Sequence, residues 1–260
     1  MTALLELAGI TKRFGLVTVA DGIDLSVGHG EALGIVGPNG AGKTTLFSMI
    51  SGDLAPDDGE VRFDGAVVTS RDAAARCRLG LGRTYQVPRP FEDMTVFENV
   101  LVAARYGAGL PTRAGYELAT SVLAETGLAA QANLRAGALT LLQRKRLEVA
   151  RALGTRPRLL LLDEVAGGLT DPEVEELVAI VRALRGRGLA IVWIEHVVRA
   201  LTSTVDRLVC LAGGSIIGDG TPAEVLASAA VREVYLGSDP EAAPAAPERT
   251  APDLLGKLLR

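Results

Sequence analysis

Two short segments of the chain are apolar at every position, a pattern that predicts strands buried on both faces. They are 159–162, which is followed by an Asp-Glu pair, and 189–194, which is followed by Glu-His. Such strands belong to a parallel sheet covered by helices, and 172–185 has the pattern of the crossover helix between them. A proline suits the first turn of that helix, with Thr170 or Asp171 as its cap.

Alternating apolar and polar residues mark a second group of strands near the N-terminus. The alternation covers 4–10 and 23–27, and a third segment, 61–63, runs into a tight turn at Asp64-Gly65. These segments predict a small antiparallel sheet beside the parallel one.

Between about residues 88 and 153 the pattern changes to the spacing of amphipathic helices. It is interrupted at 107–111 and near Gly137. We interpret this segment as a helical subdomain inserted into the core. The predicted fold class is therefore α/β, with a parallel-sheet core, a small antiparallel β subdomain and an inserted helical subdomain.

The end of the chain differs in composition from the rest. Residues 1–237 are expected to form the folded unit, whereas 238–252 are rich in Ala, Pro and Glu and bury too little apolar surface to order themselves. We expect 238–260 to be a flexible tail. Its last residues, 253–260, carry four leucines and two basic residues and could contact a membrane or a partner.

A glycine-rich segment follows an apolar run, 32–36, and precedes a helix-prone run, 45–50. It reads Gly-Pro-Asn-Gly-Ala-Gly-Lys-Thr over 37–44 and fits G-x-x-x-x-G-K-[ST], the pattern of a phosphate-binding loop. Backbone N–H groups of such a loop turn inward around phosphates, and the helix behind it adds positive potential. The residues expected to hold the nucleotide are Pro38, Asn39, Gly40, Ala41, Gly42, Lys43, Thr44 and Thr45.

Within this loop two residues have specific roles. Lys43 is expected to reach the β- and γ-phosphates, and Thr44 to hold Mg²⁺. Downstream, Asp163 ends a buried strand at the carboxyl edge of the sheet, where the metal must lie. Glu164 follows it, points away from it, and is the candidate base for water. The predicted cofactors are therefore ATP and Mg²⁺.

Composition limits the classes of function. The chain has 260 residues, 48% of them hydrophobic, and a net charge of −4, which is enough for a sizeable globular core. Apolar runs stay below the roughly 18 residues of a membrane span, and the N-terminus lacks the features of a secretory signal, so we expect a cytoplasmic protein. The mild acidity argues against nucleic-acid binding. Cys77 and Cys210 lie far apart and suggest neither a disulfide framework nor a zinc site.

The order of these motifs resembles that of the ATP-binding subunit of ABC transporters, over about residues 4–237. In that family Gln86 would contact Mg²⁺ and the attacking water, and its loop the membrane subunit. The segment 168–171 matches the D-loop, and His196 matches the histidine that contacts the γ-phosphate. Phe14 matches the aromatic residue that stacks on adenine, where Tyr is more usual.

One motif departs from the family. The signature should read close to Leu-Ser-Gly-Gly-Gln, but 139–143 reads Leu-Thr-Leu-Leu-Gln. Thr140 and Gln143 can still bind the nucleotide held by a partner cassette, whereas Leu141 and Leu142 replace the glycines that let the backbone approach phosphate. In a homodimer both sites would carry these leucines, and in a heterodimer only one.

Two further segments indicate a transporter group. The residues 83–91 with 94–100, and the segment 231–237, are similar to one ATPase subunit of branched-chain amino acid importers. The resemblance implies a second cassette, integral membrane permease subunits, an extracytoplasmic substrate-binding protein and a location on the cytoplasmic face of the membrane. The loop 87–99 would transmit motion to the permease.

Two alternatives remain open at this stage. One is a soluble ABC ATPase that acts on DNA or ribosomes, although paired cassettes, coiled coils and zinc motifs are not seen in the sequence. The other is a regulatory subunit that binds ATP but hydrolyses it weakly, because of the leucines at 141 and 142.

Overall fold

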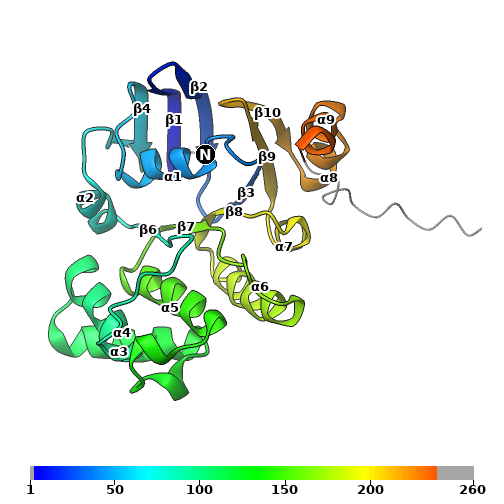
Figure 1. Ribbon diagram of the computed structural model, residues 1–260. Coiled ribbons are helices and arrows are strands. Elements are labelled where there is room, and N and C mark those ends of the chain that lie inside the picture. The colour runs from blue at the N-terminus through cyan, green and yellow to red at the C-terminus, as the bar shows by residue number, and fades with distance from the viewer. Residues whose placement is uncertain (1–2, 239–260) are drawn as a thin grey trace, which may run out of the picture.

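A six-stranded sheet forms the centre of the protein in the computed structural model, which describes residues 3–238 (Figure 1). Its strand order is β10-β9-β3-β8-β7-β6. The strands are β3 (Ala32–Val36), β6 (Leu81–Arg83), β7 (Leu159–Asp163), β8 (Ala190–Ile194), β9 (Arg207–Ala212) and β10 (Ser215–Gly220). The first five are parallel, which confirms the predicted parallel sheet, but β10 pairs with β9 in the antiparallel direction. Strands β6, β9 and β10 were not predicted from the sequence.

The two apolar runs form neighbouring strands, β7 and β8, and every residue of both is buried. They are joined by α6 (Asp171–Gly186), which confirms the predicted crossover helix. Thr170 is the cap of α6, and Glu173 accepts hydrogen bonds from the backbone N–H and hydroxyl of Thr170. This register places the ends of β7 and β8 side by side, since Asp163 pairs with Ile194.

A second, four-stranded antiparallel sheet has the order β2-β1-β4-β5. Its strands are β1 (Leu5–Phe14), β2 (Val17–Val27), β4 (Asp58–Phe63) and β5 (Ala66–Val67). The first two are longer than the predicted segments 4–10 and 23–27. Their register shifts near Gly9 and Gly22, both at positive φ, so bulges break the alternation on which the prediction depended.

The segment 88–153 contains most of the helices of the lower part of Figure 1. These are α3 (Val96–Val102), a π-helical turn (Ala103–Gly107), α4 (Thr112–Glu125), two short 3₁₀ turns (Ala129–Gln131 and Ala136–Ala138) and α5 (Leu141–Gly154). The expected break at 107–111 ends the π-helical turn, and α4 begins directly after it.

Buried residues fall into two clusters, one on each face of the central sheet. Leu160 and Leu162 of β7 belong to the cluster shared with α4, α5 and α6, whereas Leu159 and Leu161 belong to the one shared with the antiparallel sheet and α1 (Lys43–Ser51). Because successive side chains of β7 point to opposite faces of the sheet, this one strand packs against the helical subdomain on one face and the antiparallel subdomain on the other.

The remaining helices lie at the periphery: α2 (Ala73–Arg78), α7 (Val198–Thr202), α8 (Pro222–Ala227) and α9 (Ala229–Ser238). Within residues 3–238, the helices are all too short or too polar to cross a membrane. The predicted tail, 238–260, with its leucine-rich end, lies outside the described residues except for Ser238, the last residue of α9.

Candidate functional site

The loop 37–44 connects β3 to α1, and its glycines adopt conformations that other residues rarely take. Gly37, Gly40 and Gly42 have φ of 151°, 79° and 94°. A Cβ on Gly37 would collide with the carbonyl oxygen of Leu211, and one on Gly42 with that of Val19. The neighbouring β-strands therefore require glycine at both ends of the loop.

Helix α1 begins at this loop with Gly42 as its cap, so no side chain satisfies its first N–H groups. Those groups lack intrahelical partners by geometry and form an anion-binding end of the helix. Of the predicted nucleotide residues, Asn39, Gly40 and Thr44 are exposed, and Pro38 and Thr45 are half-buried. The loop is thus accessible to a phosphate chain.

Lys43 is buried, with 5% of its surface exposed. Its Nζ donates to the carbonyl oxygens of Gly37 (2.7 Å) and Pro38 (3.0 Å). Burial lowers the pKa of Lys43, while the negative charges of Glu164 and Asp163 oppose that shift. The amine is therefore held inside the loop, close to the two acids that end β7.

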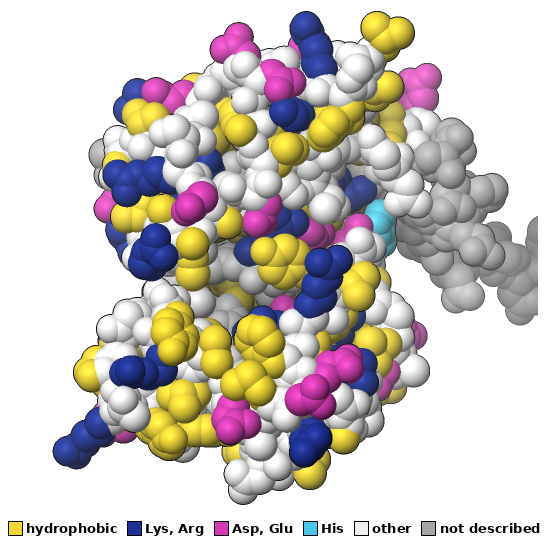
Figure 2. Space-filling view, turned by 60° about the vertical axis from the view of Figure 1, so that its left-hand side comes forward, with side chains coloured by type: hydrophobic (Ala, Val, Ile, Leu, Met, Phe, Trp, Pro, Cys, Tyr) yellow, Lys and Arg dark blue, Asp and Glu magenta, His cyan; other side chains and the backbone are white. Residues whose placement is uncertain are grey.

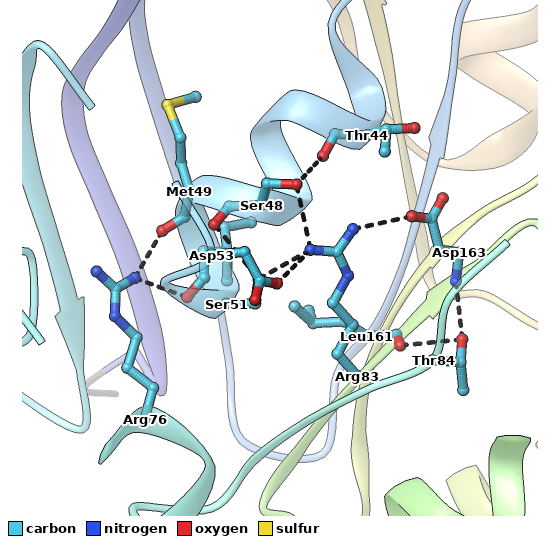
Figure 3. Close-up of polar contacts among 11 residues, drawn as sticks. Thr44, Ser48, Met49, Ser51, Asp53, Arg76, Arg83, Thr84, Leu161 and Asp163 are labelled. Carbon is cyan, nitrogen blue, oxygen red and sulfur yellow. Dashed lines mark hydrogen bonds and ion pairs between the residues drawn. The ribbon is translucent and has the colours of Figure 1, made fainter. Parts of the chain in front are cut away.

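Asp163 ends β7 and is 1% exposed. Its backbone N–H donates to the Thr84 hydroxyl, and its Oδ2 accepts from Arg83 Nη2 at 3.1 Å (Figure 3). Burial raises the pKa of this carboxyl, and Arg83 opposes the shift. Oδ1 is buried and has no hydrogen-bond partner within residues 3–238.

A buried carboxylate oxygen of this kind suits a metal ion. Mg²⁺ takes oxygen ligands and is usually bound through one or two carboxylates together with substrate phosphates. The predicted ligands, Thr44, Gln86 and Asp163, offer a hydroxyl, an amide oxygen and a carboxylate. Because Asp163 Oδ1 is orphaned, these residues fit a magnesium ion bound with a nucleotide.

The three predicted catalytic residues come together around one carboxylate. Glu164 Oε2 accepts from Gln86 Nε2 at 2.6 Å, and Glu164 Oε1 lies 2.7 Å from His196 Nε2. Glu164 has φ 46°, an uncommon value for a residue other than glycine, and its backbone N–H donates to Ile194. This turn at the end of β7 aims its side chain at loops that follow β6 and β8.

Lys145, a residue of α5 that is 3% exposed, was not predicted as a site residue from the sequence. Its Nζ donates to the backbone carbonyls of Gln86 (2.8 Å) and Glu164 (3.2 Å). Burial lowers the pKa of Lys145, and nearby carboxylates, Glu195 first, oppose this. Lys145 therefore connects the helical subdomain to the loop that carries Gln86 and the loop that carries Glu164, here called the two catalytic loops. Its only sequence signal is a charge on the buried side of a helix.

Glu195 was also missed as a site residue, although it directly precedes His196. It is 1% exposed and accepts from the Ala166 N–H (2.6 Å), the Trp193 indole (3.3 Å) and the His196 N–H (3.3 Å). Burial raises its pKa. Glu195 thus links the loop after Glu164 to the loop that carries His196.

Three predicted binding residues stand outside this cluster. Phe14 ends β1, is 52% exposed, and has Lys12 Nζ 5.7 Å from its ring centroid. Thr140 and Gln143 bond each other at the start of α5: the Thr140 hydroxyl accepts from the Gln143 N–H, and the Gln143 side chain accepts from the Thr140 N–H. These contacts cap α5.

The two unexpected leucines differ in exposure. Leu141 is 45% exposed and its Cδ2 lies 3.4 Å from the position of a Cβ on Gly168, in the predicted D-loop. Leu142 is 9% exposed, so its side chain is turned into the protein. Only Leu141 therefore adds bulk to the surface at this end of α5.

Taken together, a glycine-rich loop between β3 and a helix, and two acids at the end of β7, a buried strand of the same sheet that is separated from β3 by β8, define a P-loop nucleotide-binding cassette. A family comparison agrees: the model of the ABC transporter family matches residues 20–167, and the model described as branched-chain amino acid ATP-binding cassette transporter matches residues 215–241. The chain belongs to the ABC transporter ATP-binding family, whose members hydrolyse ATP.

Individual relatives span nearly the same length. The chain is 36% identical to the high-affinity branched-chain amino acid transport ATP-binding protein BraF of Pseudomonas aeruginosa, over 90% of this chain and 98% of that protein. It is 34% identical to the lipopolysaccharide export system ATP-binding protein LptB of Acidithiobacillus ferridurans, over 91% and 98%. The ADP conformation of the cassette MJ1267 superposes with a TM-score of 0.81 at 30% identity, over 91% and 100%.

Proposed function

We propose that this ATP-binding subunit hydrolyses ATP at the cluster of Lys43, Asp163, Glu164, Gln86 and His196. The observation that carries the proposal is the placement of Glu164 between Gln86 and His196, next to a buried lysine and a buried aspartate. Glu164 would accept a proton from water as the water oxygen attacks the γ-phosphorus and the bond to ADP breaks, giving ADP and phosphate.

The other residues would bind and orient the nucleotide. Lys43 and the first N–H groups of α1 would hold the phosphates, as the anion-binding end of a helix allows. Thr44, Gln86 and Asp163 would hold Mg²⁺, which supplies charge neutralisation at the β- and γ-oxygens. His196, at 2.7 Å from Glu164, would orient that carboxylate and reach the γ-phosphate. Phe14 would stack on the adenine.

The cargo we propose is a branched-chain or related amino acid, taken up by an importer. BraF and the C-terminal family match at 215–241 favour it, whereas the similarity to LptB indicates that the cassette itself does not fix the cargo. Membrane permease subunits, a second cassette and an extracytoplasmic binding protein would complete the assembly on the cytoplasmic face. Co-purification with permease subunits, followed by leucine uptake into vesicles driven by ATP, tests this; failure of uptake with an assembled complex would refute the cargo.

The surface supports docking of a permease near the loop 87–99. A cavity of about 240 Å³ lies between the core and the helical subdomain, lined by residues that include Arg83, Tyr85, Phe91, Glu148 and Arg151. Figure 2 shows a hollow between the two parts of the molecule, with hydrophobic and charged side chains along its edges. Val87, Tyr85 and Phe91 are 65%, 42% and 47% exposed. This apolar rim suits a protein partner.

A second candidate is a subunit that closes on ATP but hydrolyses it slowly in a homodimer. Leu141 favours it, because this exposed side chain stands where the family has a glycine. ATPase assays of the chain alone and of the assembled complex separate the two. If the Leu141 side chain slows hydrolysis, Leu141→Gly should raise the ATP turnover of the chain alone by about tenfold or more. A tenfold rise corresponds to an activation free energy lower by about 1.4 kcal/mol. Unchanged turnover rejects this candidate.

A further inference from the structure

Arg83 is a nearly buried cation that contacts two separate parts of the site. Its side chain is 7% exposed, and it is the last residue of β6, three residues before Gln86. Nη2 donates to Asp163 Oδ2 at 3.1 Å. Nη1 donates to Asp53 Oδ2 (2.8 Å) and to the hydroxyls of Ser51 (2.9 Å) and Ser48 (3.2 Å) (Figure 3). The guanidinium thus bridges the end of α1 and the end of β7.

The contact with Arg83 makes the two carboxylate oxygens of Asp163 unequal. Oδ2 is held by Arg83, whereas Oδ1 is buried and orphaned within the described part of the chain. A carboxylate held at one oxygen has a fixed orientation, which leaves Oδ1, the oxygen without a partner, as the better placed ligand for a metal ion. Metal ligands are commonly oriented in this way by a hydrogen-bonding partner behind them.

The groups bound by Nη1 lie at the cavity between the core and the helical subdomain. Asp53, Ser51 and Arg83 all line that cavity, together with Tyr85, whose ring centroid lies 4.9 Å from the Arg83 guanidinium carbon. A displacement of Asp53 or Tyr85 would therefore act on the same guanidinium that holds Asp163.

We propose that Arg83 is a positioning residue that fixes Asp163 for the metal–nucleotide complex and ties that orientation to Asp53 at the cavity between the subdomains. The inference rests on the proposed function, since it requires Asp163 to be the metal-binding carboxylate. Lysine cannot replace Arg83, because a compact ammonium does not offer the planar fork that reaches both carboxylates and two hydroxyls.

Titration of the full chain with a fluorescent ATP analogue tests this, once with EDTA and once with Mg²⁺, alongside Mn²⁺ binding in the presence of ADP by electron paramagnetic resonance. Arg83→Lys and Arg83→Met should leave affinity in EDTA within about twofold, yet lose roughly 10- to 100-fold in metal affinity, as expected for a residue that orients a ligand. Arg78→Met, on the exposed side of α2, is the matched control and should behave as wild type.

Asp53→Asn tests the tie to the cavity and keeps the test valid if Arg83→Met fails to fold. It should weaken metal binding in part, and the double variant with Arg83→Lys should be no weaker than Arg83→Lys alone, because coupled residues are not additive. Metal affinity that is unchanged or tighter in the Arg83 variants overturns the inference, as does additivity with Asp53→Asn. If the affinity of the wild-type chain for the ATP analogue is the same in EDTA and in Mg²⁺, the proposed metal site itself is refuted.

Discussion

Glu164 and His196 lie 32 residues apart in the chain, yet Glu164 Oε1 and His196 Nε2 are separated by 2.7 Å. The register of the sheet produces this contact, since β7 and β8 are adjacent and Asp163 pairs with Ile194. Each side chain then projects from the first residues beyond its strand. The carboxylate is therefore positioned by the buried core and not by the surface loops alone.

Glu164→Gln should abolish hydrolysis while ATP binding is retained. Glutamine keeps the size of the side chain and can still bond Gln86 and His196, but it does not accept a proton from water. We expect turnover to fall by roughly 10²- to 10⁴-fold, the usual contribution of a general base. The measurement is the ATPase rate of the assembled complex beside nucleotide affinity of the isolated chain. Glu175→Gln, on the exposed face of α6, is the control. An unchanged rate in Glu164→Gln would exclude Glu164 as the base.

Lys43→Met should remove nucleotide binding without unfolding the protein. The lysine is buried at a cost, as the burial-lowered pKa indicates, so an apolar side chain of similar length is tolerated by the apo fold. At an ATP concentration of 100 times the dissociation constant, bound ATP should raise the free energy of unfolding of the wild type by about 2.7 kcal/mol. A thermal shift assay should show that gain in wild type and lose it in the variant. If Lys43→Met retains the shift, the phosphate loop is not the binding site.

The sequence was informative where a motif combines a fixed spacing with a buried strand. The loop 37–44 and the acids after 159–162 were located from local pattern, and Gln86 and His196 from the resemblance to the family. The structure brings Glu164, Gln86 and His196 into contact. The relation between them is non-local, but parallel strands place their carboxyl ends at one edge of a sheet, which makes it predictable.

Other features could not be obtained from pattern alone. Arg83 is held by distant carboxylates and Lys145 by backbone carbonyls. Arg83 is not distinguishable in sequence from a solvated charge, and the place of Lys145 on the buried side of α5 does not reveal its partners. Strands β1 and β2 were underestimated because bulges at glycines interrupt a period of two. The antiparallel edge strand β10 contains glycines at both 218 and 220, which weakens its strand signal.

Lys145→Met should lower turnover more than nucleotide affinity. The variant removes the donor shared by the Gln86 and Glu164 carbonyls, so both catalytic loops lose their fixed position relative to α5. The phosphate loop, which makes its own contacts, is not touched. We expect about a tenfold or larger fall in kcat, since small displacements at a catalytic centre are costly. Lys145→Arg should restore part of the loss, because it keeps a buried donor.

The comparison of kcat with affinity decides the role of Lys145. Equal losses of nucleotide affinity and kcat in Lys145→Met would indicate general unfolding of the site and contradict a positioning role. Arg144→Met is the control at the neighbouring position of the same helix. Arg144 contacts the carbonyls of Leu139 and Gly137 and pairs with Glu92 at 3.9 Å, and none of these groups is the carbonyl of Gln86 or Glu164.

Glu195→Gln should flatten the dependence of folding stability on pH. Burial raises the pKa of Glu195 in the folded protein above its value in the unfolded chain. Between these two pKa values the folded state binds more protons, so stability falls as pH rises from the unfolded value of about 4.3 through the folded one, by about 1.4 kcal/mol for each unit of separation. Glutamine has no charge to bury, so the variant does not lose stability in this way as pH rises.

Urea unfolding from pH 4 to pH 8 measures the effect. As pH rises, the free energy of unfolding of Glu195→Gln should increase relative to that of the wild type, whereas Glu175→Gln should follow the wild-type profile. A constant difference across that range would mean that Glu195 acts through its hydrogen bonds to Ala166 and Trp193 and not through its buried charge.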